Sequence, residues 1–123
     1  MQKIDRVEIY PYDPNWPNIF DHESVMIKEA LGSNCTAIHH VGSTSVPGLA
    51  AKPKIDIIAE VRDLLFDKSQ LENLGYEYRG GFSIPLRRSF TIRMSDRKIN
   101  LHIFEENDPE IELNILFRDY LRQ

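Results

Sequence analysis

The chain contains 123 residues and has a mass of 14.3 kDa, which is the usual size of one domain. Hydrophobic residues make up 41% and charged residues 28%, and this balance excludes disorder or a collagen-like repeat for the whole chain. The 15 Lys and Arg against 19 Asp and Glu give a net charge of -4. We therefore expect no extended nucleic-acid surface, although a local basic pocket fits this balance.

The chain also lacks the usual signs of export or membrane insertion. Its longest apolar run is far shorter than the roughly 20 residues that a membrane helix needs, and residues 1–6 have no apolar core of a signal peptide. The single cysteine, Cys35, can form no internal disulfide. We therefore expect a cytoplasmic protein without a membrane partner.

The first half of the chain predicts alternating strands and helices. Residues 7–10 alternate like a short strand. An apolar stripe of helical period then predicts a helix from about Asn15 or Pro17 to Leu31, with Gly32 as its stop. Residues 35–41 and 54–61 are typical of strands. The second of these is apolar on both faces apart from Asp56 and Glu60, so we expect it to be central in a sheet covered on both sides.

The second half predicts one more helix, a set of strands and a final helix. The inward-facing leucines 64, 65, 71 and 74 predict a helix over residues 63–74. Short strands are expected over residues 76–78, 88–94 and 98–104, with turns at Gly80-Gly81 and at residues 95–97. Asp108 is expected to cap a last helix that runs to Leu121. This order predicts an α+β domain, a mixed β-sheet with helices packed against it.

The loop between the two best strands is rich in small polar residues. It reads Gly42-Ser43-Thr44-Ser45 and is followed closely by Lys52. Glycine allows backbone to approach a ligand, and successive N–H groups with hydroxyls can surround a phosphate. Lys52 would supply positive charge. The other interpretation is a polar turn that only connects two strands.

Asp56 lies among apolar residues of the second strand. A carboxylate there is costly to bury unless it meets a cation or strong donors. One solution is a divalent metal shared with phosphate oxygens. The other is a pair with a nearby Lys or Arg.

Several further positions carry charge. Adjacent strand residues point to opposite faces, so we expect one of His39 and His40 to be packed and the other to be free to reach the Gly-Ser loop. Arg87, Arg88 and Arg93 form a basic patch near the expected hairpin. It either protects an edge strand from aggregation or clamps a phosphorylated ligand.

Residues 40–58 resemble the GrpB family, also called UPF0157, whose hallmark is close to H-[IV]-G-S-T-[AS]-V-P-G-L-x-A-K-P-x-I-D-I. The flanking segments at residues 12–17, 87–90, 101–104 and 116–121 also agree. The resemblance implies the nucleotidyltransferase fold superfamily, and relatives of the family occur fused to dephospho-CoA kinase. It predicts one domain over residues 1–123, either a short member or one without the C-terminal helix of longer relatives.

The resemblance also implies roles for individual residues. Gly42 and Ser43, with Thr44 and Ser45, would bind nucleotide phosphates, and Lys52 and Arg88 would neutralise the transferring group. Asp56 would be catalytic and hold Mg²⁺ or Mn²⁺. Ile58 stands where the superfamily has a second carboxylate, and Glu60 lies about 13 Å along the strand from Asp56, too far to replace it. His102 stands where a third acid is expected and is a second catalytic candidate.

These residues leave three functions open. The first is metal-assisted transfer of a nucleotidyl group to an unknown acceptor. The second is non-catalytic binding of a nucleotide or CoA-like phosphorylated metabolite, and the missing carboxylate at Ile58 is the feature that separates it from the first. The third is a structural partner domain in which the Gly-Ser loop is only a turn. In the first two the partner is a phosphorylated small molecule.

Overall fold

The computed structural model describes residues 8–80, 87–94 and 96–123. Its helices are α1 (Trp16–Leu31), α2 (Ser69–Asn73) and α3 (Pro109–Leu121), and two single 3₁₀ turns are η1 (Gly32–Asn34) and η2 (Ser43–Ser45). The strands are β1 (Cys35–Val41), β2 (Lys54–Val61), β3 (Glu77–Gly80), β4 (Arg87–Arg93) and β5 (Lys98–Glu105).

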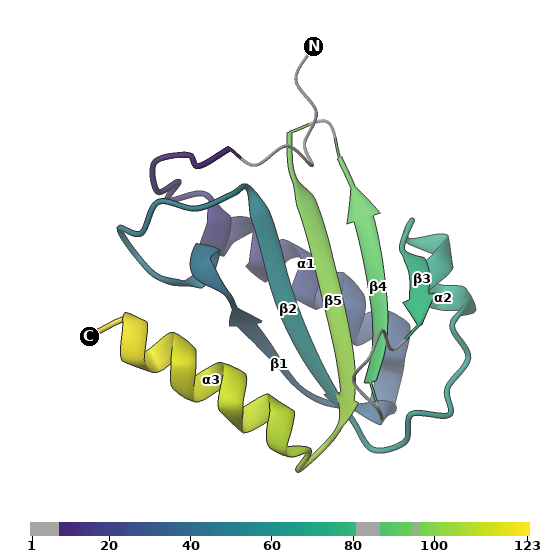
Figure 1. The fold of residues 1–123 in the computed structure, drawn as a ribbon. Coiled ribbons are helices and arrows are strands. Elements are labelled where there is room, and N and C mark those ends of the chain that lie inside the picture. Colours follow the sequence, from purple (N-terminus) through teal and green to yellow (C-terminus); the bar gives the residue numbers. More distant parts are fainter. Residues whose placement is uncertain (1–7, 81–86, 95) are drawn as a thin grey trace.

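The strands form one mixed sheet in the order β1-β2-β5-β4-β3 (Figure 1). The two central strands, β2 and β5, run parallel, and every other neighbouring pair is antiparallel. This arrangement confirms the α+β class and the mixed sheet that the sequence predicts.

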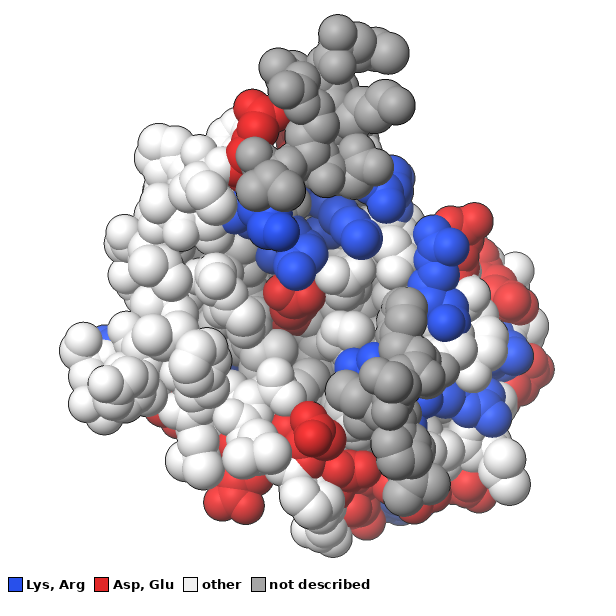
Figure 2. Space-filling model, viewed as in Figure 1, with Lys and Arg blue, Asp and Glu red and all other residues white. Residues whose placement is uncertain are grey.

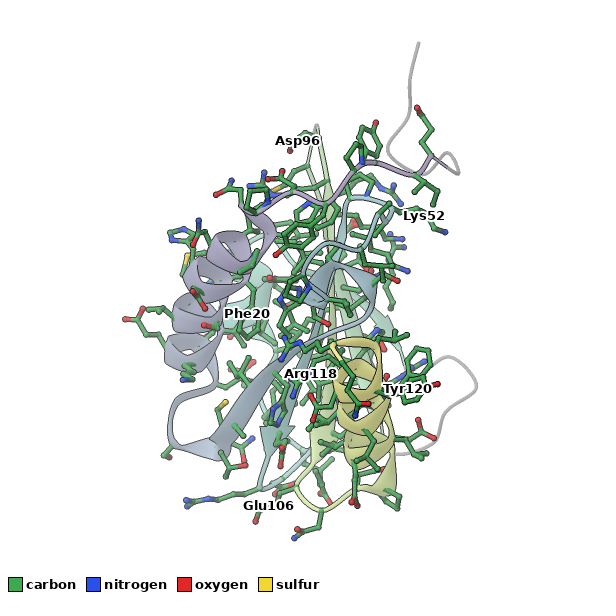
Figure 3. The ribbon with its side chains drawn as sticks, turned by 90° about the vertical axis from the view of Figure 1, so that its left-hand side faces the viewer. Phe20, Lys52, Asp96, Glu106, Arg118 and Tyr120 are labelled. Atoms are coloured by element: carbon green, nitrogen blue, oxygen red, sulfur yellow. The ribbon has the colours of Figure 1, made fainter. Side chains whose placement is uncertain are left out.

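The sheet carries its main core on the face that α1 covers. Alternate residues of β2 and β5 point to that face because strand side chains alternate. They are fully or almost fully buried against α1, and they are Ile55, Ile57, Ala59, Val61, Ile99, Leu101 and Ile103. The opposite face is covered only in part. There α3 packs beside β1 through a small cluster of Val41, Ile58, Phe104 and Ile111. Figure 3 shows α1 and α3 on opposite sides of the sheet.

Strand β2 is therefore central, as expected, but it is covered completely on only one face. On its second face Ile58 is buried, whereas Lys54, Asp56 and Glu60 are half-buried. We call this side of the sheet, opposite α1, the open face.

The helix predicted over residues 63–74 is wrong for most of its length. Only Ser69–Asn73 is helical, and Leu65, expected to face inward, is 82% exposed. The Asp63 side chain accepts a hydrogen bond from Leu65 N at 2.8 Å, and Asp67 accepts one from Ser69 N at 2.9 Å. Such local bonds compete with helix formation, which accounts for the loop at residues 63–68.

The other expected elements agree with the structure to within a few residues, apart from the first strand. Of residues 8–10, only Tyr10 pairs, through a bridge to Ala51. Gly80 ends β3, while Gly81 and Ser95 of the two expected turns lie outside the described residues. Asp108 caps α3 as predicted and accepts a hydrogen bond from Glu110 N at 2.9 Å.

The two adjacent histidines point to opposite faces, as predicted. His40 lies on the α1 face, where its ring stacks on Phe20 with a centroid distance of 4.9 Å. Its Nε2 lies 3.1 Å from the Thr44 hydroxyl in the Gly-Ser loop. His39 lies on the open face and pairs with Glu60. His40 therefore links α1 to the loop.

The C-terminal end of α3 is hydrogen-bonded to β1 and to the same loop. Arg118 donates a hydrogen bond to the His40 carbonyl at 3.2 Å, and Arg122 donates one to the Ser45 carbonyl at 2.9 Å. In Figure 3, Arg118 points toward the sheet and Tyr120 points away from it. None of the helices in the described part of the chain is both long and apolar enough to cross a membrane.

The His40 site predicts a specific pH dependence of stability. Burial, with Arg122 and Arg118 nearby, lowers the pKa of His40 to about 4 from the ordinary 6.5. The unfolded chain then binds a proton more readily than the folded one between these values, so stability is lost as the pH falls through this window. We expect His40 to contribute a loss of about 1 to 2 kcal/mol between pH 7 and pH 5.

Urea unfolding of the wild type and of His40→Phe at both pH values measures this contribution. The variant keeps an aromatic ring against Phe20 but has no group that gains a proton. The difference in unfolding free energy between the two proteins should therefore shrink at pH 5. An offset that is the same at pH 7 and pH 5 would contradict the assignment.

Candidate functional site

The open face carries polar side chains in three rows across its central strands. Strand pairing sets the rows, because residues opposite one another in neighbouring strands share a face. From β2 through β5 to β4, the rows are Lys54–Lys98–Arg93, Asp56–Asn100–Thr91 and Ile58–His102–Ser89. The first row is cationic, and the second joins a carboxylate to an amide and a hydroxyl.

Asp56 lines a pocket of about 250 Å³ together with Gly42, Ser43, Lys52 and Lys54. We call this the Asp56 pocket. The Gly-Ser loop and the lone acid of β2 therefore meet on one side of the sheet. This is the arrangement that the sequence predicts for binding an anion beside a carboxylate.

Gly42 is required where the loop passes Asp56. It has a φ of +77°, and a Cβ added there would lie 2.5 Å from Asp56 Oδ2. Real Cβ atoms do not approach an oxygen so closely, and this backbone conformation is one that L side chains rarely adopt. The residue type thus sets both the direction of the loop and its contact with the acid.

The loop is held by its own hydroxyl groups. Ser45 Oγ donates to the Gly42 carbonyl at 2.5 Å, and Thr44 Oγ1 donates to the Lys54 carbonyl at 3.1 Å. Both residues are buried, at 4% and 1% exposure, whereas Ser43 is exposed and lines the pocket. Thr44 and Ser45 therefore support the loop, and Ser43 is the hydroxyl that faces a ligand.

Asp56 is stabilised by one amide and by nearby cations. Asn100 Nδ2 donates to Asp56 Oδ1 at 3.2 Å. Burial raises the pKa of Asp56, and Lys54, the Asn100 bond, Lys98 and Lys52 oppose that rise. The carboxyl group therefore lies in a site where its ionised form depends on the surrounding positive charge.

Three lysines give this part of the face a positive character. Within the part of the chain that the structure describes, Lys52, Lys54 and Lys98 form no ion pair. Burial, together with Arg93, Lys54 and Arg79, lowers the pKa of Lys98. Figure 2 shows the cationic side chains of this face gathered around a hollow that contains acidic atoms.

A second pocket of about 320 Å³ lies beside the Asp56 pocket. It is lined by Arg79, Ser89, Thr91, Lys98, Asn100 and His102. Ser89 Oγ lies 2.9 Å from His102 Nδ1. Burial, with Arg87 and Lys54 nearby, lowers the pKa of His102 to about 4, so its imidazole is neutral at pH 7. We call this cavity the His102 pocket.

The structure brings together some of the predicted site residues and separates others. Gly42, Ser43, Lys52 and Asp56 share one pocket. His102 lies in the neighbouring pocket, diagonally across from Asp56 at roughly 8 Å between Cα atoms by ordinary strand geometry.

Arg88 is separated from this site. It lies on the α1 face, with its guanidinium 5.2 Å from the Phe66 ring. Because strand side chains alternate, Arg88 shares the face of Phe90 and not that of Asp56. We therefore leave Arg88 out of the candidate site.

Three residues of the site were missed in the sequence. Lys54 lies two residues before Asp56 on the same face of β2, and Asn100 and Lys98 come close to Asp56 because β5 lies parallel to β2 in matched register. Both strands place polar residues at alternating positions within apolar runs, and this shared pattern was the available signal. The sequences of β2 and β5 do not by themselves specify that these two strands pair.

The residues present do not fit a centre that holds two metal ions. The described residues contain no group of three or more His, Cys, Asp and Glu side chains placed to hold a metal. At the position of the second expected carboxylate, Ile58 is 1% exposed and packs in the apolar cluster beneath α3. Asp56 is thus a single carboxylate, which supports an ion only when a ligand supplies further oxygens.

Comparison with known proteins identifies the family. The model of the GrpB protein family matches residues 6–123, so the chain belongs to the GrpB family. It is 42% identical over 121 residues to the UPF0157 protein YqkA of Bacillus subtilis, covering 95% of this chain and 35% of YqkA. It therefore spans about a third of that relative. It is also 27% identical over 143 residues to a dephospho-CoA kinase of Mycolicibacterium paratuberculosis, covering 94% of this chain and 35% of that protein.

Two solved structures resemble the fold. The conserved protein GrpB of Enterococcus faecalis superposes with a TM-score of 0.85 at 38% identity, covering 94% of this chain and 72% of that one. The Cid1 poly(U) polymerase superposes with a TM-score of 0.59 at 13% identity, covering 91% of this chain and 37% of Cid1. The second likeness shows that the fold is nucleotidyltransferase-like.

The contact between Gly42 and Asp56 predicts the effect of a methyl group. Gly42→Ala should lower the free energy of unfolding by about 3 kcal/mol or more, because the backbone cost of about 1–2 kcal/mol adds to the clash with Asp56. Gly48→Ala is the matched control, since Gly48 also has a positive φ of +82° but has open space around its Cβ position. It should show the backbone cost alone.

Chemical denaturation of both variants, alone and combined with Asp56→Ala, measures the two terms. Removing the carboxylate should relieve part of the destabilisation by Gly42→Ala and none of that by Gly48→Ala. If the changes in unfolding free energy were additive for Asp56→Ala with Gly42→Ala as well as with Gly48→Ala, Gly42 would be constrained by its φ angle only.

Proposed function

We propose that this chain binds a nucleotide or a related phosphorylated small molecule, with a phosphate group in the Asp56 pocket. The observation that carries the proposal is the pair of lysines, Lys52 and Lys54, that line the pocket with the Gly42-Ser43 turn and form no ion pair within the described residues. A phosphate supplies the negative charge that these side chains lack. The proposal includes a cytoplasmic location, in keeping with a single cysteine that can form no internal disulfide.

The chemistry of the pocket suits a phosphate better than a cation. Lysine ammonium groups and a glycine-serine turn are common phosphate ligands. Lys52, Lys54 and Lys98 outnumber the one carboxylate beside them, so the site carries net positive charge before a ligand arrives. Each charge-assisted hydrogen bond to the phosphate contributes about 1.5–3 kcal/mol.

Titration calorimetry with AMP and other mononucleotides, and with CoA, tests this proposal in the absence of divalent metal. The double variant Lys52→Met, Lys54→Met should weaken binding tenfold or more, because it removes two of the charges that meet the phosphate. Lys28→Met is the matched control, since Lys28 is exposed on α1 across the sheet. No binding of any phosphorylated compound, or equal binding by wild type and double variant, would refute the proposal.

A second candidate function is metal-assisted nucleotidyl transfer to an acceptor. The contact of the Gly42-Ser43 turn with Asp56, on a nucleotidyltransferase-like fold, favours it. Asp56 would be the residue that holds Mg²⁺ or Mn²⁺ together with phosphate oxygens of the nucleotide. Such an ion would neutralise charge on those oxygens. His102, neutral and beside the site, would be the other catalytic candidate.

Asp56→Asn distinguishes binding from transfer. The variant removes a carboxylate that is costly to bury, so the protein should keep or gain stability, and metal-free nucleotide binding should be unchanged or tighter. Transfer would require that Mg²⁺ strengthens nucleotide binding in the wild type and not in the variant. It would also require label transfer from an α-labelled nucleotide, measured on small-molecule and protein acceptors, that the variant abolishes. If Mg²⁺ changed nucleotide binding equally in the wild type and in Asp56→Asn, nucleotidyl transfer through Asp56 would be refuted.

A further inference from the structure

The Asp56 pocket and the His102 pocket form one continuous polar surface. Asp56 lines the first and Asn100 lines the second, and the hydrogen bond of 3.2 Å between them forms the boundary. Neighbouring strands are about 4.8 Å apart, so groups bound over β2 and over β5 or β4 would lie about 5 to 10 Å apart. A single small molecule can reach both.

The His102 pocket is built to receive negative charge. Its two cations, Arg79 and Lys98, come from different strands, and no carboxylate is among the described residues that line it. The hydroxyl residues Ser89 and Thr91 also line it. Arg79 also lies 3.5 Å from Glu77, but the two side chains are 46% and 73% exposed, and such exposed pairs contribute little to stability.

The polar side chains of this pocket are fixed by one another. Ser89 is hydrogen-bonded to His102 at 2.9 Å, and Thr91 donates to Asn100 at 3.3 Å. Ser89 and Thr91 are also buried, at 1% and 6% exposure. Side chains that are already ordered lose little freedom when a ligand binds, so this surface is arranged in advance for a bound group.

We propose that the His102 pocket binds a second anionic group of the same ligand that places its first phosphate in the Asp56 pocket. The ligand would then carry at least two phosphates about 5 to 10 Å apart, either along a polyphosphate chain or on separate positions. Arg79 and Lys98 would bind the second group. This inference rests on the proposed function and narrows its ligand class to compounds with more than one phosphate.

Calorimetric titration with AMP, ATP and adenosine 3′,5′-bisphosphate tests this, without divalent metal. The wild type should bind ATP, the bisphosphate or both at least tenfold more tightly than AMP. Arg79→Ala should weaken the tighter ligand about tenfold and AMP less than about twofold. Lys98→Gln should also weaken binding of the tighter ligand. Agreement between the two variants would show that the loss does not come from misfolding of one of them.

Arg93→Ala is the matched control, because Arg93 belongs to the same face and carries the same charge but lines neither pocket. Equal losses from Arg93→Ala and Arg79→Ala would show a general charge effect and overturn the second site. If AMP binds through Lys52 and Lys54 but neither multiply phosphorylated compound binds more tightly, the second anion site is refuted and the proposed function still holds. If no compound binds, the proposed function fails with it.

Discussion

The close contact between Gly42 and the Asp56 carboxylate is the constraint on which the open face depends. The Gly-Ser loop, β2 and β5 meet at Asp56. Its carboxylate lies against Gly42 on one side and accepts a hydrogen bond from Asn100 on the other. A buried carboxylate is unfavourable unless its surroundings supply donors and positive charge. The surrounding lysines are therefore part of the same arrangement, and they outnumber the one carboxylate that they surround.

Local pattern explains which elements were predictable. Strand β2 follows from an apolar run that only Asp56 and Glu60 interrupt, and α3 follows from Asp108 before an apolar stripe. The leucines at positions 64, 65, 71 and 74 predict a helix over residues 63–74. Residues 63–68 do not form it, because the Asp63 and Asp67 side chains accept hydrogen bonds from backbone N–H groups two residues ahead. The periodicity shows only the spacing of the apolar residues. The competing hydrogen bonds from side chains to the backbone determine the backbone conformation.

The candidate site was predictable only where its residues are near in sequence. The Gly-Ser loop and Asp56 lie close along the chain, and one short connection brings them together. Asn100 and Lys98 reach Asp56 through the parallel pairing of β5 with β2, which no local pattern specifies. Arg88 is different, because its alternation with Phe90 already placed it on the apolar face of β4. That information was present in the sequence and was not used.

Ile58 connects the chemistry of the site to the fold. At this position a second carboxylate would complete a metal centre, but the side chain instead packs with Val41, Phe104 and Ile111 beneath α3. A carboxylate there would be buried in an apolar cluster and would weaken the attachment of α3. Arg118 of that helix donates to the His40 carbonyl of β1, and Arg122, just after the helix, donates to Ser45 at the end of the Gly-Ser loop. The side chain that stands in place of a metal ligand thus helps to hold α3 against the Gly-Ser loop, so one residue both leaves Asp56 as a single carboxylate and supports the loop beside it.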